Sequence, residues 1–291
     1  MLINQKNSGR SVNYFFGVHL PLIFVIIFIL TASIGISQTI EIPKSKSNKG
    51  KLYIYWGWNN DWFSNSNISF TGTDYDFTLK DVSSNDRQSP FNIDTYLNPS
   101  TMTIPQYNFR VGYFFKENWD ISIGVDHMKY VVTNGQTVGI TGTIGDTSSN
   151  YSGTYDNELI RISTDFLRFE HTDGLNYISI AFRRSDRIAT LGKIDLSITE
   201  GLGAGIIIPK TNTVLLGKER YDEFHLSGFA INSMIGINIK FWDSFFIQPE
   251  FKAGYVNMPD IRTTKSILDK ASQTFLFTQL NFVIGASIDL N

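Results

Sequence analysis

The segments between the strand-like stretches of this chain are alternately long and short. From their alternation of apolar and polar residues, eight stretches are expected to be β-strands: 52–62, 104–115, 119–132, 175–185, 193–208, 224–240, 244–256 and 275–290. The seven segments between them have 41, 3, 42, 7, 15, 3 and 18 residues. Outer-membrane barrels have an even number of antiparallel strands, joined alternately by short periplasmic turns and longer extracellular loops. The spacing therefore predicts an all-β fold, an eight-stranded antiparallel transmembrane up-and-down β-barrel with long extracellular loops.

The N-terminus has the parts of a secretory signal. Lys6 and Arg10 precede an apolar stretch, and small residues follow it up to Ser37. A positive segment, a short apolar segment and small residues before a cut define such a signal. We expect a signal peptide at 1–37, a basic periplasmic leader at 38–50 and the barrel domain at 51–291. An uncleaved inner-membrane anchor is the alternative, because residues 15–36 are almost long enough to span a bilayer.

The amino-acid composition excludes some kinds of site and argues against one class of partner. Cysteine is absent, which excludes a disulfide framework and a thiolate metal site. Basic and acidic residues number 25 and 27, and this balance argues against nucleic acid as a partner. We expect no cofactor.

The last strand-like stretch separates its two faces cleanly. Leu280, Phe282 and Ile284 fall on one face, while Gln279 and Asn281 fall on the other. Successive side chains of a strand point to opposite faces, so one side would meet lipid and the other the lumen. All five tryptophans lie near strand ends, as expected for rings that collect at the two membrane surfaces.

The same parity predicts a polar network inside the barrel. Arg110, Arg183, Glu250 and Lys252 fall on lumen-facing positions. Eight strands leave an interior only just wide enough for side chains, and buried charges must be paired. We therefore expect these residues to close the lumen rather than line a pore.

The two longest loops are expected to form an outer cap. Residues 67–82 alternate well enough to be a hairpin standing above the membrane, and residues 133–174 contain the strand-like sequence QTVGITGTI. Loops of this length are usually functional or disordered.

Several polar residues are predicted at the extracellular rim: His127, His171, Asp173, His225 and Arg262. Histidine and carboxylate together suit zinc or copper. However, no HxxxH or HExxH spacing places two ligands on one element. Parity puts His127 on the lipid face, while His171 is expected in a loop. We therefore expect no shared metal site.

The stretch FHLSG, with His225 and Ser227, resembles the His-x-Ser of outer-membrane lipid A deacylases. Parity places both residues on the lipid side, as such an enzyme requires. That family has an acid about a dozen residues further on, where this chain has Ile239 and Lys240. The two residues are therefore only candidates for catalysis, and we expect their replacement by alanine to leave lipid A acylation unchanged.

A wider resemblance rests on IPQYNFRVGYFFKENWDISIGVDHMKYVV, FEHTDGLNY, PKTNT and GYVNMPDIRTT. These segments resemble the uncharacterised small outer-membrane β-barrel proteins of Gram-negative bacteria. The resemblance implies the fold and the outer membrane, with outer-membrane lipid, lipopolysaccharide and the barrel insertion machinery as partners, and it implies no activity. We expect a structural or surface-interaction role, with a lipid A-modifying acyl hydrolase at the outer rim or small-solute transport as alternatives.

Overall fold

The computed structural model describes residues 47–145, 149–218 and 220–290. The predicted signal peptide (1–37) and residues 38–46 of the predicted leader lie outside the described residues. Eight long strands form the barrel: β1 (Lys51–Phe63), β5 (Tyr107–Lys116), β6 (Trp119–Val132), β9 (Leu167–Leu191), β10 (Ile194–Pro209), β12 (Gly228–Phe241), β13 (Phe245–Arg262) and β14 (Lys270–Asp289).

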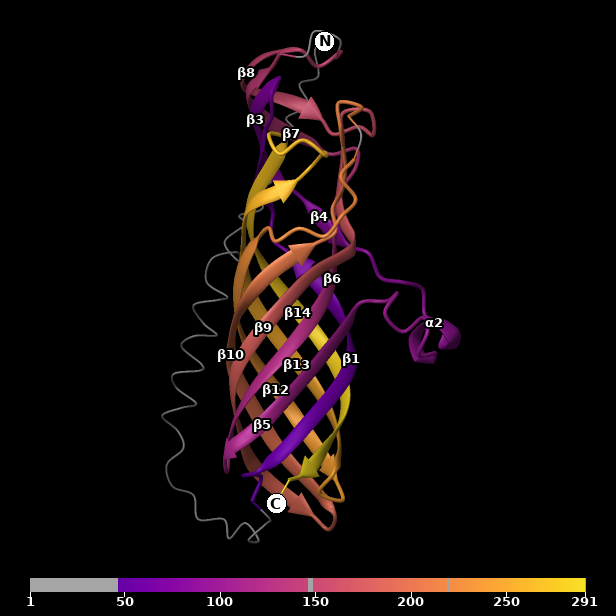
Figure 1. Cartoon of the computed structure of the whole chain (residues 1–291), viewed down its shortest axis with the longest axis vertical. Coiled ribbons are helices and arrows are strands. Elements are labelled where there is room, and N and C mark those ends of the chain that lie inside the picture. Colours follow the sequence, from indigo (N-terminus) through magenta and orange to yellow (C-terminus); the bar gives the residue numbers. More distant parts are fainter. Residues whose placement is uncertain (1–46, 146–148, 219, 291) are drawn as a thin grey trace, which may run out of the picture. The chain divides into compact units, whose positions relative to one another are not determined.

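These eight strands close into a barrel. Each pairs antiparallel with the next one along the chain. The first and last strands then pair over their lengths, from Lys51 opposite Asp289 to Phe63 opposite Phe277. Figure 1 shows the strands crossing obliquely around the barrel wall. The predicted eight-stranded up-and-down antiparallel barrel is confirmed.

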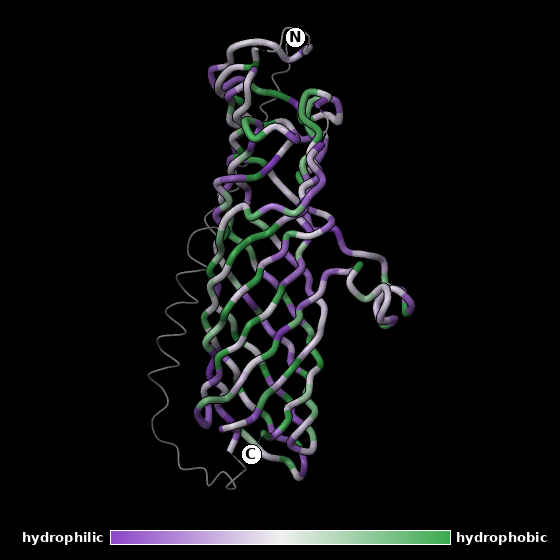
Figure 2. Tube along the Cα trace, viewed as in Figure 1, coloured by the Kyte–Doolittle hydropathy of each residue, from purple (hydrophilic) through white to green (hydrophobic). Residues whose placement is uncertain are grey.

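Sequence alternation sets which side chains face inward. Along β14, Leu280 and Phe282 are exposed on the outer surface, while Gln279 and Asn281 are buried in the interior. Apolar and polar residues alternate along the barrel strands in Figure 2. A period of two along a strand separates an apolar outside from a polar inside.

One end of the barrel carries short turns, and we call it the short-turn end. Two residues join β5 to β6, two join β9 to β10 and three join β12 to β13. In the last of these turns Trp242 and Asp243 both have positive φ, 51° and 62°, as a type I′ hairpin turn requires.

At the opposite, long-loop end the sheet continues beyond the barrel. The added elements are β2 (Ser66–Thr71), β3 (Tyr75–Val82), β4 (Ser84–Asp86), β7 (Thr137–Ile144), β8 (Gly153–Arg161) and β11 (Asn212–Leu215), with one short helix, α2 (Ile93–Leu97). Strands β2, β3, β7 and β8 extend in that order from the outer end of β14, and we call them the cap.

The hairpin expected at 67–82 is present as β2 and β3, and the QTVGITGTI segment contains β7. Phe70 stacks on Phe77 with ring centres 5.3 Å apart, and Phe169 meets Phe70 edge-on at 5.6 Å. The two long connections are therefore largely folded around an apolar core. No helix in the described ranges is long and apolar enough to cross a membrane.

Four predicted strand starts are wrong. The fourth strand starts at Leu167 rather than 175, because its outer part pairs with β11 and with the end of β6. The eighth starts at Lys270 rather than 275, because its outer part pairs with β2. The second starts at Tyr107 rather than 104, and the sixth at Gly228 rather than 224. All four errors lie at the long-loop end, where pairing depends on segments distant in the sequence.

Candidate functional site

A buried ion pair crosses the barrel interior. Arg183 of β9 contacts Glu250 of β13 with 3.0 Å between Nη2 and Oε1, and the two side chains are 4% and 1% exposed. The guanidinium also lies over the rings of Tyr53 and Tyr55, at 5.8 and 5.7 Å. Inside the barrel, the Arg183 guanidinium thus contacts one carboxylate and the faces of two aromatic rings.

A second ion pair joins Lys252 of β13 to Asp126 of β6, both side chains buried. The Asp126 carboxylate also accepts a hydrogen bond from Asn108. Asp126 was not among the residues predicted for the lumen, although it shares parity with Asp120 and Ser122. Counting parity along β6 could have found it.

Arg110 is held by hydroxyl groups. Its guanidinium donates to Tyr55 Oη at 3.2 Å, Ser122 Oγ at 3.1 Å and Ser179 Oγ at 2.9 Å. The buried charges at this level balance in number. We call these charged side chains, with Tyr53 and Tyr55, the polar layer: Arg110, Arg183, Lys252, Asp120, Asp126 and Glu250.

Tyr53 and Tyr55 were absent from our sequence-based candidates. The Tyr53 ring lies against Gly112 of β5, at the place a β-carbon would occupy. Its hydroxyl donates to Asp120 Oδ1 at 2.7 Å. Each of the two rings lies at an odd position of β1 opposite a glycine on a neighbouring strand, Gly112 of β5 for Tyr53 and Gly285 of β14 for Tyr55, and this is the sequence signal that marks them.

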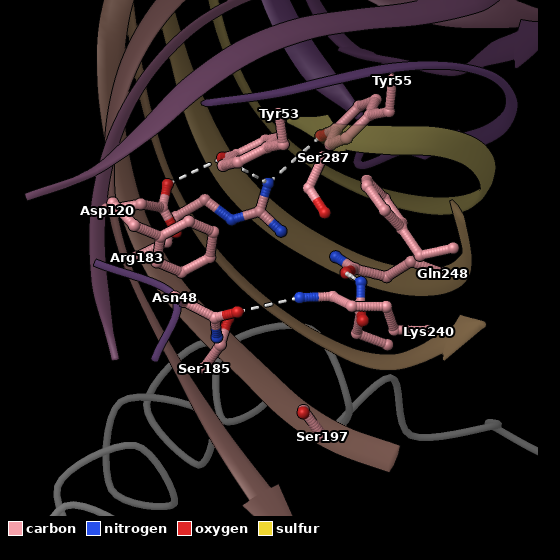
Figure 3. Close-up of a pocket in the computed structure, with 13 residues that line it drawn as sticks. Asn48, Tyr53, Tyr55, Asp120, Arg183, Ser185, Ser197, Lys240, Gln248 and Ser287 are labelled. Atoms are coloured by element: carbon pink, nitrogen blue, oxygen red, sulfur yellow. Dashed lines mark hydrogen bonds between the residues drawn. The ribbon is translucent and has the colours of Figure 1, made fainter. Parts of the chain in front are cut away.

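Below the polar layer, at the short-turn end, lies a small cavity of about 30 Å³. In Figure 3, Arg183 and Tyr53 line one side, and Lys240 donates to Asn48 Oδ1 at 3.0 Å on the other. Each water needs roughly 10–15 Å³ of such volume. The cavity therefore has room for about two water molecules and is too small for an organic solute.

Toward the long-loop end the interior becomes apolar. We define an apolar layer of large buried side chains above the polar one: Tyr130, Tyr177, Met258, Phe275 and Phe277. Tyr130 stacks on Phe275 with ring centres 5.0 Å apart. The barrel interior is thus filled by the polar layer near the short turns and the apolar layer near the cap, with the buried, hydrogen-bonded Asp61 and Gln279 between them.

His127 lies on the outward side of β6 but is covered. Its ring stacks on Tyr107 at 4.9 Å, and Tyr107 stacks on Trp56 at 4.5 Å. His127 Nδ1 is 2.8 Å from Asn176 Oδ1, and the residue is 7% exposed. The histidine is part of an aromatic ladder across adjacent strands.

The other rim candidates are separated. His171 is fully buried and lies in β9, so its expected loop position is wrong. Asp173 is exposed and 3.5 Å from Lys210 Nζ. Arg262 lies over the ring of Tyr221 at 4.8 Å. In the described parts of the chain, His, Cys, Asp and Glu form no group of three that could hold a metal ion.

His171 makes the cap and the outer part of β9 that packs on it sensitive to acid. The residue lies in this outer part of β9, opposite Tyr130 of β6, with Nδ1 2.9 Å from Thr211 Oγ1. Its ring lies 5.1 Å from that of Phe169, which packs on Phe70 of β2 in the cap. Burial lowers its pKa from 6.5 to about 3. Below pH 6.5 the unfolded chain binds a proton that the folded cap excludes, so this stability is present above pH 6.5 and is lost as the pH falls toward 3.

We therefore expect the urea midpoint of cap unfolding to fall as the pH drops below 6.5. Near-ultraviolet circular dichroism of the cap tyrosines would measure it. The variant His171→Gln should lose most of this pH dependence, whereas His225→Gln, outside the cap core, should keep it. An unchanged pH profile in His171→Gln would contradict the assignment.

The expected lipid-facing position of Ser227 is wrong. Ser227 is buried, while its neighbour Leu226 is 56% exposed, because β12 starts only at Gly228 and the strand parity does not extend to it. The Ser227 hydroxyl contacts the backbone carbonyl of His225 at 3.4 Å. His225 Nε2 lies 2.9 Å from Asp260 Oδ2. The ring and the hydroxyl thus have different partners.

The chain is similar to solved structures of outer-membrane proteins. No family model and no curated protein matches the chain. The outer membrane protein AlkL in lipid bilayers is 8% identical with a TM-score of 0.36, covering 88% of this chain and 98% of its own. OprG from Pseudomonas aeruginosa is 9% identical with a TM-score of 0.34, covering 83% and 97%. Neisserial surface protein A is 9% identical with a TM-score of 0.33, covering 82% and 99%.

Proposed function

We propose that this protein is an outer-membrane β-barrel with a lumen closed by its own side chains and a structural or surface-interaction role carried by the cap and the rim. It would reach the membrane by export and the barrel insertion machinery. No substrate is needed to account for the closed interior.

The apolar exterior of the closed barrel carries the proposal. Each of the eight strands contributes a large apolar side chain between 40% and 59% exposed: Ile54, Tyr113, Ile123, Ile180, Leu202, Ile231, Phe245 and Leu280. Soluble monomers rarely expose contiguous apolar surface of more than a few hundred Å². An apolar surface around a barrel with no open edge suits a bilayer.

Aromatic rings near both ends support the same proposal. Trp242 is 67% exposed at the short-turn end, and Trp62 is 51% exposed toward the long-loop end. Trp119 stacks on Phe182 at 4.8 Å beneath the Arg184 guanidinium. Such rings collect where a membrane meets water.

Fractionation tests this function. We expect the protein in the outer-membrane fraction, with a gel mobility that changes on heating, since a closed barrel has no free edge at which unfolding can start. Recovery from the soluble periplasm would overturn the proposal.

The filled interior predicts a closed barrel. In planar lipid bilayers we expect no stable ionic conductance, because an eight-stranded interior is filled by its side chains. The double variant Arg110→Ala/Arg183→Ala should also stay closed, since the apolar layer above remains intact. Sustained channels of porin size in the unmodified protein would instead favour solute transport.

Basic side chains at the long-loop end suit lipopolysaccharide. Lys210 bridges Asp173 and Asp222, and Arg220 contacts Asp222 at 3.0 Å. Arg262 is held over Tyr221. Arginine and lysine bind phosphate through charge-assisted hydrogen bonds, so this rim would meet the phosphates of the outer leaflet.

A further inference from the structure

A short segment leaves the barrel wall sideways instead of joining the cap. It comprises residues 88–105, between β4 and β5, and contains α2; we call it the lateral arm. Figure 1 shows α2 standing beside the barrel rather than beyond its end. The Asn92 side chain caps the helix by accepting a hydrogen bond from the Asp94 amide.

The lateral arm is fastened to the outside of the barrel. Lys129 of β6 donates to Ser89 Oγ at 3.2 Å and to the Ile104 carbonyl at 2.8 Å, which ties both ends of the arm to one residue. Tyr96 of α2 lies 6.1 Å from Trp58 of β1, ring centre to ring centre. The arm is therefore held in place against the wall.

Its outer surface is apolar and almost uncharged. Phe91 is 78% exposed, Ile93 66% and Leu97 60%. Asp94 is the single charged residue in the sequence from 88 to 105. An exposed apolar cluster of this kind marks an interaction surface.

The arm's position on the barrel identifies what would cover that surface. Trp58, which contacts the arm, is paired with Phe282, an exposed residue of the apolar exterior. Trp62 is also exposed and lies four residues farther toward the long-loop end, about 13 Å along the strand at the usual rise. The arm thus joins the wall inside the apolar exterior, below the outermost exposed tryptophan of β1.

We propose that the lateral arm is a membrane anchor that buries Phe91, Ile93 and Leu97 in the outer leaflet, at the boundary of headgroups and acyl chains. Interfacial segments insert their apolar face to this depth. The inference rests on the proposed membrane barrel, because the arm continues its lipid-facing surface. The arm would limit rotation and tilt of the barrel from one side.

The absence of cysteine allows a clean test with single-cysteine variants carrying an environment-sensitive fluorophore. The folded protein is placed in phosphatidylcholine vesicles with or without bromine on the acyl chains. Phe91→Cys reports on the arm, and Leu97→Cys is a second position in case the first does not fold. Leu159→Cys in β8 is the matched control, since Leu159 and Phe91 are both 78% exposed.

A fourth variant, Ile123→Cys, reports on the barrel wall itself. Bromine should reduce the fluorescence at 91, 97 and 123 to about half or less, because interfacial segments lie roughly 5–10 Å into the headgroup and acyl boundary. Position 159 should be unaffected. Quenching at 123 without quenching at 91 and 97 would overturn the anchor and leave the membrane barrel standing. Loss of quenching at all three would overturn both.

Discussion

Replacing Glu250 with alanine is expected to lower the free energy of unfolding of the barrel by about 3–5 kcal/mol, because removing one partner of a buried ion pair leaves the other charge uncompensated. Arg183, its partner at 3.0 Å, is only 4% exposed, and the small cavity beside it has room for about two water molecules, too few to restore its full hydration. Urea unfolding in lipid vesicles, followed by tryptophan fluorescence, would measure the loss.

Two further variants separate charge from packing. Asp186→Asn breaks the half-exposed contact between Arg184 and Asp186 on the same strand and should cost less than about 1 kcal/mol. The paired change Arg183→Met/Glu250→Leu removes both buried charges and should recover most of the stability, as apolar replacements of buried pairs often do. Equal losses in Glu250→Ala and the paired variant would contradict this account.

The barrel strands next to short turns were the most predictable part of the fold. The third strand was expected at 119–132, and β6 spans those residues. Short turns fix the register of neighbouring strands, so local alternation determines these strands almost completely. The alternation along β14 likewise separated the lipid side from the interior, as the burial of Gln279 and exposure of Leu280 show.

Long-range pairing limited the prediction at the other end. β9 continues outward past Gly174, whose φ is 130°, because distant β11 offers it a partner. The sequence of residues 167–174 does not by itself predict pairing with β11. The same limit misplaced His171 in a loop and Ser227 on the lipid face.

The interior was predictable by parity but not in its division into layers. All four residues predicted for the lumen, Arg110, Arg183, Glu250 and Lys252, lie inside the barrel. Arg183 and Glu250 form an ion pair with each other, and Lys252 forms one with Asp126. Asp126 was not predicted in the lumen, although it is buried there on the side of β6 opposite to its neighbour His127. The apolar layer was not foreseen, since aromatic residues near strand ends suggested only the membrane surfaces.

Phe277 is the residue through which the apolar layer can be tested. Its ring packs on Gly254 of β13, in the space left by the missing β-carbon, and meets Tyr177 edge-on at 6.4 Å. The residue is 1% exposed. Because the pocket is closed on every side by strands, the neighbouring side chains have little freedom to fill a void.

We therefore expect Phe277→Ala to lower the free energy of unfolding by about 3–5 kcal/mol, the usual cost of truncating a buried aromatic ring. Phe282→Ala is the matched control on the same strand, because that ring is 47% exposed on the outer face and lipid can fill the space it leaves. Its loss should be less than half as large under the same urea titration in vesicles. Similar losses in both variants would mean that the interior packs no more tightly than the lipid-facing wall, and the two-layer closure of the lumen would then be wrong.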